Sequence, residues 1–268
     1  MPTPSTLERC GYPPLSLPAS AVTPGVHGGR APYEGYQRGV GLEYGGLRAA
    51  VEGHPLYQEA LQAATGRTVM SGDRLKNLFL IVAVFFDALE SRNIIEFGCY
   101  KGGSVLFFAT LLKRLYPKAK VYGLDTFKGM PRNDRELDLH GEGEFADTSV
   151  EDIRKAARAL RLDNVILVEG LVQDTFPSGA PRDAAFGLAH IDLDLYAPIK
   201  YVQDAVWGRM TPGGYVVYDD ATASTCIGAT QAVEELIADR RVHSEQVFPH
   251  FVFRAGLDAG QGLNTLHG

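Results

Sequence analysis

The sequence predicts an α/β protein built around a doubly wound, mostly parallel sheet. From about residue 48 onward, short apolar runs that end at a glycine or an acidic residue alternate with longer helical segments. This alternation is typical of βαβ units, in which a helix connects two parallel strands. Hydrophobic residues make up 45% of the 268-residue chain and charged residues 22%, which is typical of a globular protein.

Charge and cysteine content exclude several classes of protein. A formal net charge of −6 provides no basic surface for nucleic acid or for an anionic membrane. The longest apolar run, residues 78–86, is too short to span a bilayer, and the first residues lack the pattern of a signal peptide. The cysteines Cys10, Cys99 and Cys226 have neither disulfide nor metal-ligand spacing, which favours a reducing compartment. We therefore expect a cytoplasmic protein that binds neither nucleic acid nor membranes.

The chain divides into an N-terminal segment, residues 1–46, and one α/β domain, residues 47–268. Seven of the 15 prolines precede residue 33, so the segment cannot form long helices. Its tyrosines argue against complete disorder and favour docking on the domain, on a partner subunit or on substrate. They are Tyr12, Tyr33, Tyr36 and Tyr44.

The first half of the domain contains two predicted strands. Residues 48–64 and 73–90 are predicted to form one helix each. The apolar run 93–98 ends in a glycine turn and is a predicted strand, the segment 102–116 is a helix, and 120–125 is the second strand.

A long loop, residues 128–148, follows the second strand. It is rich in Gly, Asp and Glu and lacks periodicity, and loops of this length inside a domain are commonly lids or binding loops. Ser149 then starts a helix that runs to about residue 160, with Asp152 completing an acidic variant of the capping box. Residues 164–170 form the predicted third strand.

The second half of the domain carries two further parallel strands. The segment 185–195 contains the fourth strand, residues 198–210 a helix, and the run ending at Asp220 the fifth strand. Another helix spans 227–239, and the apolar segments on either side of Pro249 predict a terminal antiparallel hairpin.

Two acidic pairs follow the fourth and fifth strands: Asp192 with Asp194, and Asp219 with Asp220. Because neighbouring parallel strands open into one crevice at their carboxyl ends, the four carboxylates are expected to converge. Their mutual repulsion requires compensation, and Mg²⁺, which prefers oxygen ligands, is the natural cation. A single Asp-Asp pair is also a common helix N-cap, but two such pairs favour a metal site.

A glycine-rich turn follows the first strand, in the sequence Glu96–Ser104. Its GxxxGG spacing matches neither the dinucleotide fingerprint nor the P-loop, so taken alone it also fits a tight strand–helix turn. Asp125 lies 29 residues after Glu96, at the end of the second strand, where an acidic side chain can accept hydrogen bonds from ribose hydroxyls. A ligand with a ribose, a positive charge and no phosphate fits S-adenosylmethionine (SAM) better than NAD.

Residues after the first three strands are the predicted cofactor contacts. Gln173 and Asp174 follow the third strand and are placed either to reach an adenine edge or to cap a helix. The predicted set is Glu96, Gly98, Tyr100, Ser104, Asp125, Thr126, Phe127, Gly170, Gln173 and Asp174.

Basic side chains near the acidic pairs provide further candidates. His190, on the same strand face as Asp192, is predicted to be either a second base or substrate contact, or a packed strand histidine. In the long loop, His140 is placed to reach substrate, and Arg132 and Arg135 to pair with a diphosphate; a solvated loop face is the alternative for all three.

Three blocks of sequence resemble the macrocin/novobiocin-type O-methyltransferases: GLDTFKGMP (123–131), HIDLDLYAP (190–198) and GGYVVYDD (213–220). The turn EFGCYKGGS and the helix MSGDRLKNL are also similar, so the resemblance covers about residues 68–254. It implies a Rossmann-like class I SAM methyltransferase fold, SAM and Mg²⁺ as cofactors, and methylation of sugar hydroxyls of antibiotics.

The resemblance also implies roles for individual residues. Asp192, Asp219 and Asp220 correspond to metal ligands, and Asp194 to the general base. Glu96, Gly98, Asp125 and Asp174 fall where the family contacts SAM. The predicted catalytic residues are Asp192, Asp194 and His190.

The predicted function is Mg²⁺-assisted O-methylation of a deoxysugar hydroxyl, either on a nucleotide sugar such as TDP-rhamnose or on a glycosylated antibiotic. Related enzymes are often oligomers, so a homo-oligomer is expected. One alternative is a catechol-type methyltransferase acting on a phenol, although Leu195 occupies the position of that group's lysine base. Another is a SAM-binding module without catalytic activity.

Overall fold

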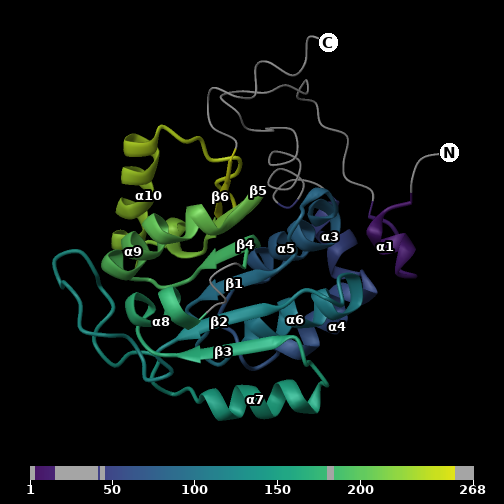
Figure 1. Cartoon of the computed structure of the whole chain (residues 1–268), viewed down its shortest axis with the longest axis horizontal. Coiled ribbons are helices and arrows are strands. Elements are labelled where there is room, and N and C mark those ends of the chain that lie inside the picture. Colours follow the sequence, from purple (N-terminus) through teal and green to yellow (C-terminus); the bar gives the residue numbers. More distant parts are fainter. Residues whose placement is uncertain (1–3, 16–41, 43–45, 180–183, 257–268) are drawn as a thin grey trace, which may run out of the picture.

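A six-stranded sheet with the order β3-β2-β1-β4-β5-β6 forms the centre of the molecule (Figure 1). The computed structural model describes residues 4–15, 42, 46–179 and 184–256. Neighbouring strands from β3 to β5 are parallel, and β6 pairs antiparallel with β5. The strands are β1 (Ile94–Phe97), β2 (Val121–Asp125), β3 (Val165–Glu169), β4 (Phe186–Ile191), β5 (Met210–Tyr218) and β6 (Phe251–Arg254).

The predicted doubly wound sheet with an antiparallel terminal element is therefore confirmed. The main partner of β6 is β5, while Gln246 forms only an isolated antiparallel bridge with Val252. Most of the predicted N-terminal segment, 1–46, lies outside the described residues. Its described part includes α1 (Thr6–Arg9), where Leu7 is buried and Arg9 forms a 2.8 Å ion pair with Asp87.

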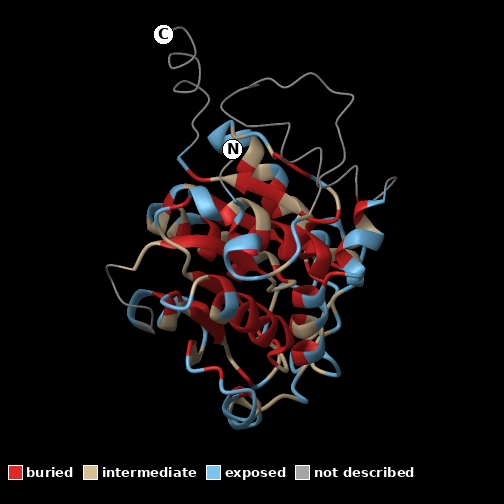
Figure 2. Cartoon of the chain, turned by 90° about the vertical axis from the view of Figure 1, so that its right-hand side faces the viewer, coloured by how far each residue is buried: buried red, intermediate tan, exposed pale blue. Residues whose placement is uncertain are grey.

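Helices cover both faces of the sheet, and apolar residues divide between the faces because successive strand residues point to opposite sides. Ile94 packs into one core cluster and its neighbour Ile95 into the other. Buried residues accordingly concentrate in the central elements (Figure 2). The first face carries α3 (Leu47–Glu52), α4 (Pro55–Ala64), α5 (Gly72–Leu80), α6 (Gly103–Leu115) and α7 (Val150–Ala159). The second carries α8 (Val172–Gly179), α9 (Tyr196–Val206) and α10 (Ile227–Arg240).

Two predicted helices are interrupted. Residues 48–64 form α3 and α4 rather than one helix, and Pro55 begins α4. Proline lacks the N–H that would continue the first helix but is favoured at the first position of the next one. The predicted helix 73–90 ends as α5 at Leu80, and the chain continues as a π-helical turn, Ile81–Phe85, and a 3₁₀ turn, Phe86–Ala88.

The connections after the strands place polar residues at one edge of the sheet. Ser149 caps α7 by accepting a hydrogen bond from the Asp152 amide at 3.3 Å, as the sequence predicted. The long loop between β2 and α7 begins at the carboxyl end of β2, where the parallel strands finish (Figure 1). Among the helices that the structure describes, none combines the length and apolar character needed to cross a lipid bilayer.

Candidate active site

A cleft at the carboxyl ends of the parallel strands contains most of the predicted site residues. It extends from the turn after β1 to the residues that follow β5. Ten predicted residues line it: Gly98, Tyr100, Asp125, Thr126, Gly170, Gln173, Asp192, Asp194, Asp219 and Asp220. The structure therefore brings the glycine-rich turn and both acidic pairs into one continuous space.

Both acidic pairs lie beyond the ends of their strands. Because β4 ends at Ile191, the side chains of Asp192 and Asp194 need not follow the alternating directions of strand residues. Asp194 adopts a left-handed backbone with φ of 57°, and its amide donates a 3.2 Å hydrogen bond to Oδ2 of Asp220. This contact ties the first acidic pair to the second.

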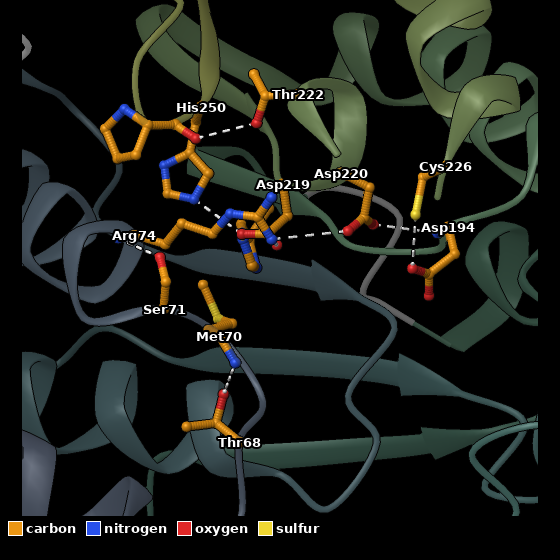
Figure 3. Close-up of polar contacts among 12 residues, drawn as sticks. Thr68, Met70, Ser71, Arg74, Asp194, Asp219, Asp220, Thr222, Cys226 and His250 are labelled. Atoms are coloured by element: carbon orange, nitrogen blue, oxygen red, sulfur yellow. Dashed lines mark hydrogen bonds and ion pairs between the residues drawn. The ribbon is translucent and has the colours of Figure 1, made fainter. Parts of the chain in front are cut away.

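Arg74, near the start of α5, provides a positive charge within the acidic cluster. Its Nη1 forms an ion pair with Oδ2 of Asp219 and lies 3.8 Å from Oδ1 of Asp220. Figure 3 shows the side chain extending from α5 toward both carboxylates. The side chain of Arg74 is only 19% exposed, so the pair is poorly screened by water. Arg74 lies 145 residues from Asp219 in the chain, so no local sequence pattern indicates this contact.

Two buried histidines hold the other oxygen of Asp219. His190 Nε2 is 3.3 Å from Oδ1, and His250 Nε2 is 2.8 Å from the same atom. The other ring nitrogen of His250 faces Nδ2 of Asn77 at 3.2 Å, and Gln246 donates to Oδ1 of Asn77 at 3.0 Å. This chain of contacts is consistent with a neutral His250 that donates to Asp219, since burial lowers the pKa of His250.

Asp219 and the other three aspartates differ in their electrostatic environment. Burial would raise the pKa of Asp219, but hydrogen bonds from His190 and His250 outweigh burial and lower it. Burial, followed by the charges of Asp194 and Asp219, raises the pKa of Asp220 to about 8. Burial is also the main cause of raised pKa values at Asp192 and Asp194. The cluster therefore holds more carboxylates than the described basic side chains neutralise.

Donor atoms in the cluster are arranged closely enough to hold a cation. Carboxylate oxygens of Asp192, Asp194 and Asp220 all lie within 4.8 Å of one another. Two of these residues, Asp192 and Asp220, are predicted metal ligands. The third predicted ligand is Asp219, whereas the third member of this group is Asp194. A hard divalent cation prefers such oxygen donors, so the residues fit Mg²⁺.

Gly98 allows two turns of the cleft to approach closely. Its φ is 87°, and a Cβ at this position would lie 1.6 Å from the backbone oxygen of Asp192. Every other amino acid would therefore separate the turn after β1 from the turn after β4. Tyr100 and Asp194 in these turns, and Phe127 in the turn after β2, also have positive φ values, and such strain is common at functional sites.

Asp125 holds the glycine-rich turn. Its Oδ2 accepts hydrogen bonds from the amides of Cys99 at 2.6 Å and Tyr100 at 2.8 Å, and its Oδ1 accepts from Phe127 at 2.7 Å. A carboxylate has about four acceptor sites, so the backbone uses most of them. A contact between Asp125 and a ribose stays a prediction.

Several predicted residues lie outside the cleft lining. They are Glu96, Ser104, Phe127, Asp174 and His190. Glu96 is completely buried, with Oε1 2.8 Å from Nδ1 of His190 and with Oε2 lacking a hydrogen-bond partner among the described residues. Asp174 lies in the first turn of α8, where an acidic side chain favours the helix.

The cleft also has an apolar side that is absent from the predicted set of site residues. Met70, Met130 and Phe145 contribute to its lining, together with other apolar residues. Phe145 packs edge-on against Tyr100 with ring centroids 5.2 Å apart, which places the long loop over the glycine-rich turn. The sequence offered no signal for this contact because the loop lacks periodicity.

Comparison with known proteins identifies the fold and the family. The solved structure of the O-methyltransferase NovP matches with a TM-score of 0.60 and 23% identity, covering 70% of this chain and 82% of that chain. The fold is that of class I SAM-dependent methyltransferases. The family model of macrocin-O-methyltransferase (TylF) matches residues 57–246, more than half of the chain. The chain therefore belongs to the macrocin-O-methyltransferase family.

Two curated relatives agree with this assignment. One, from Streptomyces olivaceus, is 8-demethyl-8-(2,3-dimethoxy-alpha-L-rhamnosyl)-tetracenomycin-C 4'-O-methyltransferase, which is 29% identical over 174 residues, 61% of this chain and 66% of the relative. The other is mycinamicin III 3''-O-methyltransferase of Micromonospora griseorubida, which is 27% identical over 192 residues, 67% of this chain and 73% of the relative. The predicted family, and with it the enzyme class O-methyltransferase, is confirmed.

Proposed function

We propose that this protein transfers a methyl group from SAM to a hydroxyl of a deoxysugar, with the assistance of Mg²⁺. One observation carries the proposal: a single cleft contains both the glycine-rich turn with Asp125 and the four aspartates that follow β4 and β5. A methyl donor and a cation-bound acceptor need such adjacent subsites, because transfer requires the reacting atoms to be in line.

The metal is proposed to be held by Asp192, Asp219 and Asp220. Asp219 and Asp220 are buried and Asp192 is half-buried, so their mutual repulsion favours a divalent cation, and Arg74 already supplies part of the compensating charge. SAM supplies the methyl group, and Mg²⁺ supplies positive charge that makes a sugar hydroxyl more acidic. His190 and His250 then have a positioning role, since they fix the orientation of Asp219 from behind the cleft.

Asp194 is proposed to accept the proton of the reacting hydroxyl. It lines the cleft beside Asp192, and its raised pKa brings it closer to the range in which a carboxylate is an effective base near neutral pH. Leu195, at the position of the catechol-type lysine, is buried and carries no proton acceptor.

The proposed substrate is a deoxysugar attached to a larger natural product. The relative from Streptomyces olivaceus is named for methylation of a rhamnosyl-bearing tetracenomycin, and this supports a glycoside. Arg132 and Arg135, the loop residues predicted to pair with a diphosphate, are exposed and do not line the cleft. The apolar lining, which includes Met130 and Phe145, is suited to an aglycone.

Methyl transfer to a panel of acceptors tests the proposal. The panel contains rhamnosylated polyketides, TDP-rhamnose and catechol, each assayed with Mg²⁺ and with EDTA. We expect transfer to a glycoside that EDTA abolishes. Transfer to TDP-rhamnose alone would move the substrate class to nucleotide sugars, transfer to catechol alone would support the phenolic alternative, and transfer unaffected by EDTA would refute the metal-assisted mechanism. SAM binding without any transfer would indicate a binding module.

The assembly and location of the protein stay predictions. We propose a cytoplasmic homo-oligomer in which the segment 1–46 contributes to subunit contacts or to the substrate site. Light scattering of the full chain, compared with a chain that begins at residue 47, measures whether removal of this segment changes the assembly.

A further inference from the structure

Three potential metal ligands that the proposed mechanism does not use as a group converge beside the acidic cluster. The Sγ atom of Cys226 donates to Oδ1 of Asp194 at 3.3 Å, and Nε2 of His140 lies 3.9 Å from the same oxygen. The three donor atoms all lie within 4.8 Å of one another. Figure 3 shows the Cys226 sulfur pointing at the Asp194 carboxylate from the start of α10.

These ligands come from three separate parts of the chain. His140 belongs to the long loop after β2, Asp194 to the turn after β4, and Cys226 to the N-cap of α10. Their convergence is therefore a property of the tertiary structure, and the spacing of the cysteines in the sequence could not reveal it.

The donor set is suited to zinc. Thiolate, imidazole and carboxylate are the three protein ligands that Zn²⁺ accepts in tetrahedral sites, whereas Mg²⁺ prefers oxygen alone. Tetrahedral bonds of about 2.0 to 2.3 Å place neighbouring donor atoms roughly 3.3 to 3.6 Å apart. The two measured separations, 3.3 and 3.9 Å, need only small adjustments to reach this range.

The histidine is also oriented as a ligand. Nδ1 of His140 lies 2.8 Å from Oε2 of Glu144, while Oε1 of Glu144 accepts from the Gly141 amide at 2.6 Å. Glu144 thereby fixes the ring and leaves Nε2 directed at Asp194. Histidines that bind metal commonly make this kind of contact to a carboxylate through the other ring nitrogen.

We propose that His140, Asp194 and Cys226 form a Zn²⁺ site distinct from the Mg²⁺ site, with solvent as the fourth ligand. On binding, the Cys226 thiol loses its proton to solvent and zinc takes the place of the S–H···O contact. Zinc at this site occupies the Asp194 carboxylate and ties the long loop to α10. Zinc at this site should therefore inhibit methyl transfer. This inhibition rests on the proposed function, because it requires Asp194 to accept the substrate proton, whereas zinc binding itself does not depend on that function.

Titration of the full chain with Co²⁺, a spectroscopic substitute for zinc, tests the site. Excess Mg²⁺ is present throughout to occupy the proposed Mg²⁺ site at Asp192, Asp219 and Asp220. We expect one equivalent of Co²⁺ to produce a thiolate charge-transfer band that Zn²⁺ abolishes by competition. Cys226→Ser should lose the band, whereas Cys10→Ser, which changes an exposed cysteine far along the chain, should keep it.

Two further variants separate ligation from folding. Glu144→Gln should weaken cobalt affinity by roughly 10- to 100-fold, as loss of an orienting carboxylate does in other sites. His140→Gln, on the partly exposed loop, should weaken it more strongly, and circular dichroism monitors folding of both. A band that persists in Cys226→Ser, or affinities unchanged in both loop variants, would overturn the proposal.

Activity is a separate readout. For the wild type and each variant, the rate of methyl transfer with Zn²⁺ is divided by the rate of the same protein without Zn²⁺. This ratio should be below one in the wild type and close to one in Cys226→Ser. A cobalt site in a protein that transfers no methyl group would refute the proposed function and leave the zinc site standing. Methyl transfer without the thiolate band would refute the zinc site and leave the proposed function standing.

Discussion

The Nδ1 atom of His190 lies 2.8 Å from Oε1 of Glu96, and neither side chain is exposed to solvent. The two residues are register partners on the adjacent parallel strands β1 and β4. His190 reaches Asp219 through its other ring nitrogen, so the interior of the sheet is linked to the acidic cluster by hydrogen bonds. His190 thus contacts Asp219 without lining the cleft itself.

The stability of the metal-free protein should fall as the pH rises from 7 to 9.5. Burial lowers the pKa of His190, but hydrogen bonds with Asp219 and Glu96 outweigh burial and raise it to about 9. An unfolded histidine has a pKa of about 6.5, so this stabilisation is complete below that pH and is lost as the pH rises through the folded-state value. The raised pKa of Asp220, about 8, acts in the same direction.

Thermal unfolding in EDTA across this pH range measures the effect. His190→Gln should give a flatter dependence of the unfolding midpoint on pH, because the titrating ring is gone. A wild-type midpoint that rises between pH 7 and 9.5 would contradict the assignment of a charged His190.

Arg74→Met should destabilise the metal-free protein by about 3 kcal/mol, since it removes one partner of a largely buried ion pair. Added Mg²⁺ should raise the unfolding midpoint of this variant more than that of the wild type, because the cation replaces the missing positive charge. Arg48→Met is the matched control: its pair with Asp73 is more exposed, with the Arg48 side chain 43% exposed, and its loss should cost less than about 1 kcal/mol. Equal losses in the two variants would show that Arg74 does not stabilise the acidic cluster.

Gly98→Ala should cost more than about 4 kcal/mol or prevent folding, because the added Cβ overlaps a backbone oxygen in the adjacent turn. Gly66→Ala provides the comparison: Gly66 also has a positive φ, 73°, but a Cβ there meets nothing within 4 Å. The free energy of unfolding of Gly66→Ala should fall by only about 1 to 2 kcal/mol, the cost of a left-handed backbone for a residue with a Cβ. Chemical denaturation of both variants measures the difference, and similar losses would rule out the close approach to Asp192.

Asp194→Asn should lower kcat by roughly 10²- to 10⁴-fold, the range expected for loss of a general base. The Mg²⁺ concentration that gives half-maximal rate should change little, whereas Asp192→Asn should raise it. Asp204→Asn, in an exposed pair with Arg240, controls for the loss of one acidic charge. If Asp194→Asn retained wild-type kcat, the proton would have to leave by another route.

Much of the fold could be predicted because its signals are local. Apolar runs such as 93–98 end at residues that terminate strands, and the segments between them are long enough for helices. The break between α3 and α4 was not predicted, although Pro55 was visible, because a proline inside a helical pattern either kinks a helix or starts a new one.

The site was only partly predictable because its remaining partners are distant in sequence. The four aspartates could be placed together from strand order alone, since parallel strands share an edge. Arg74 and His250 could not be placed beside Asp219 in this way. Their contacts depend on how α5 packs against the sheet and how β6 pairs within it. The pairing of Tyr218 with Phe251 sets the register that brings His250 opposite Asp219, and that register was not visible in the sequence.

The position of His250 has a consequence for how the protein is made. Its contact with Asp219 requires β6, the last described strand, to be in place beside β5. During synthesis from the N-terminus, Arg74 and all four aspartates leave the ribosome before this strand does. The acidic cluster thus acquires this histidine partner only after residue 250 has been synthesised, so a nascent chain that stalls earlier lacks one of the two histidine contacts of Asp219.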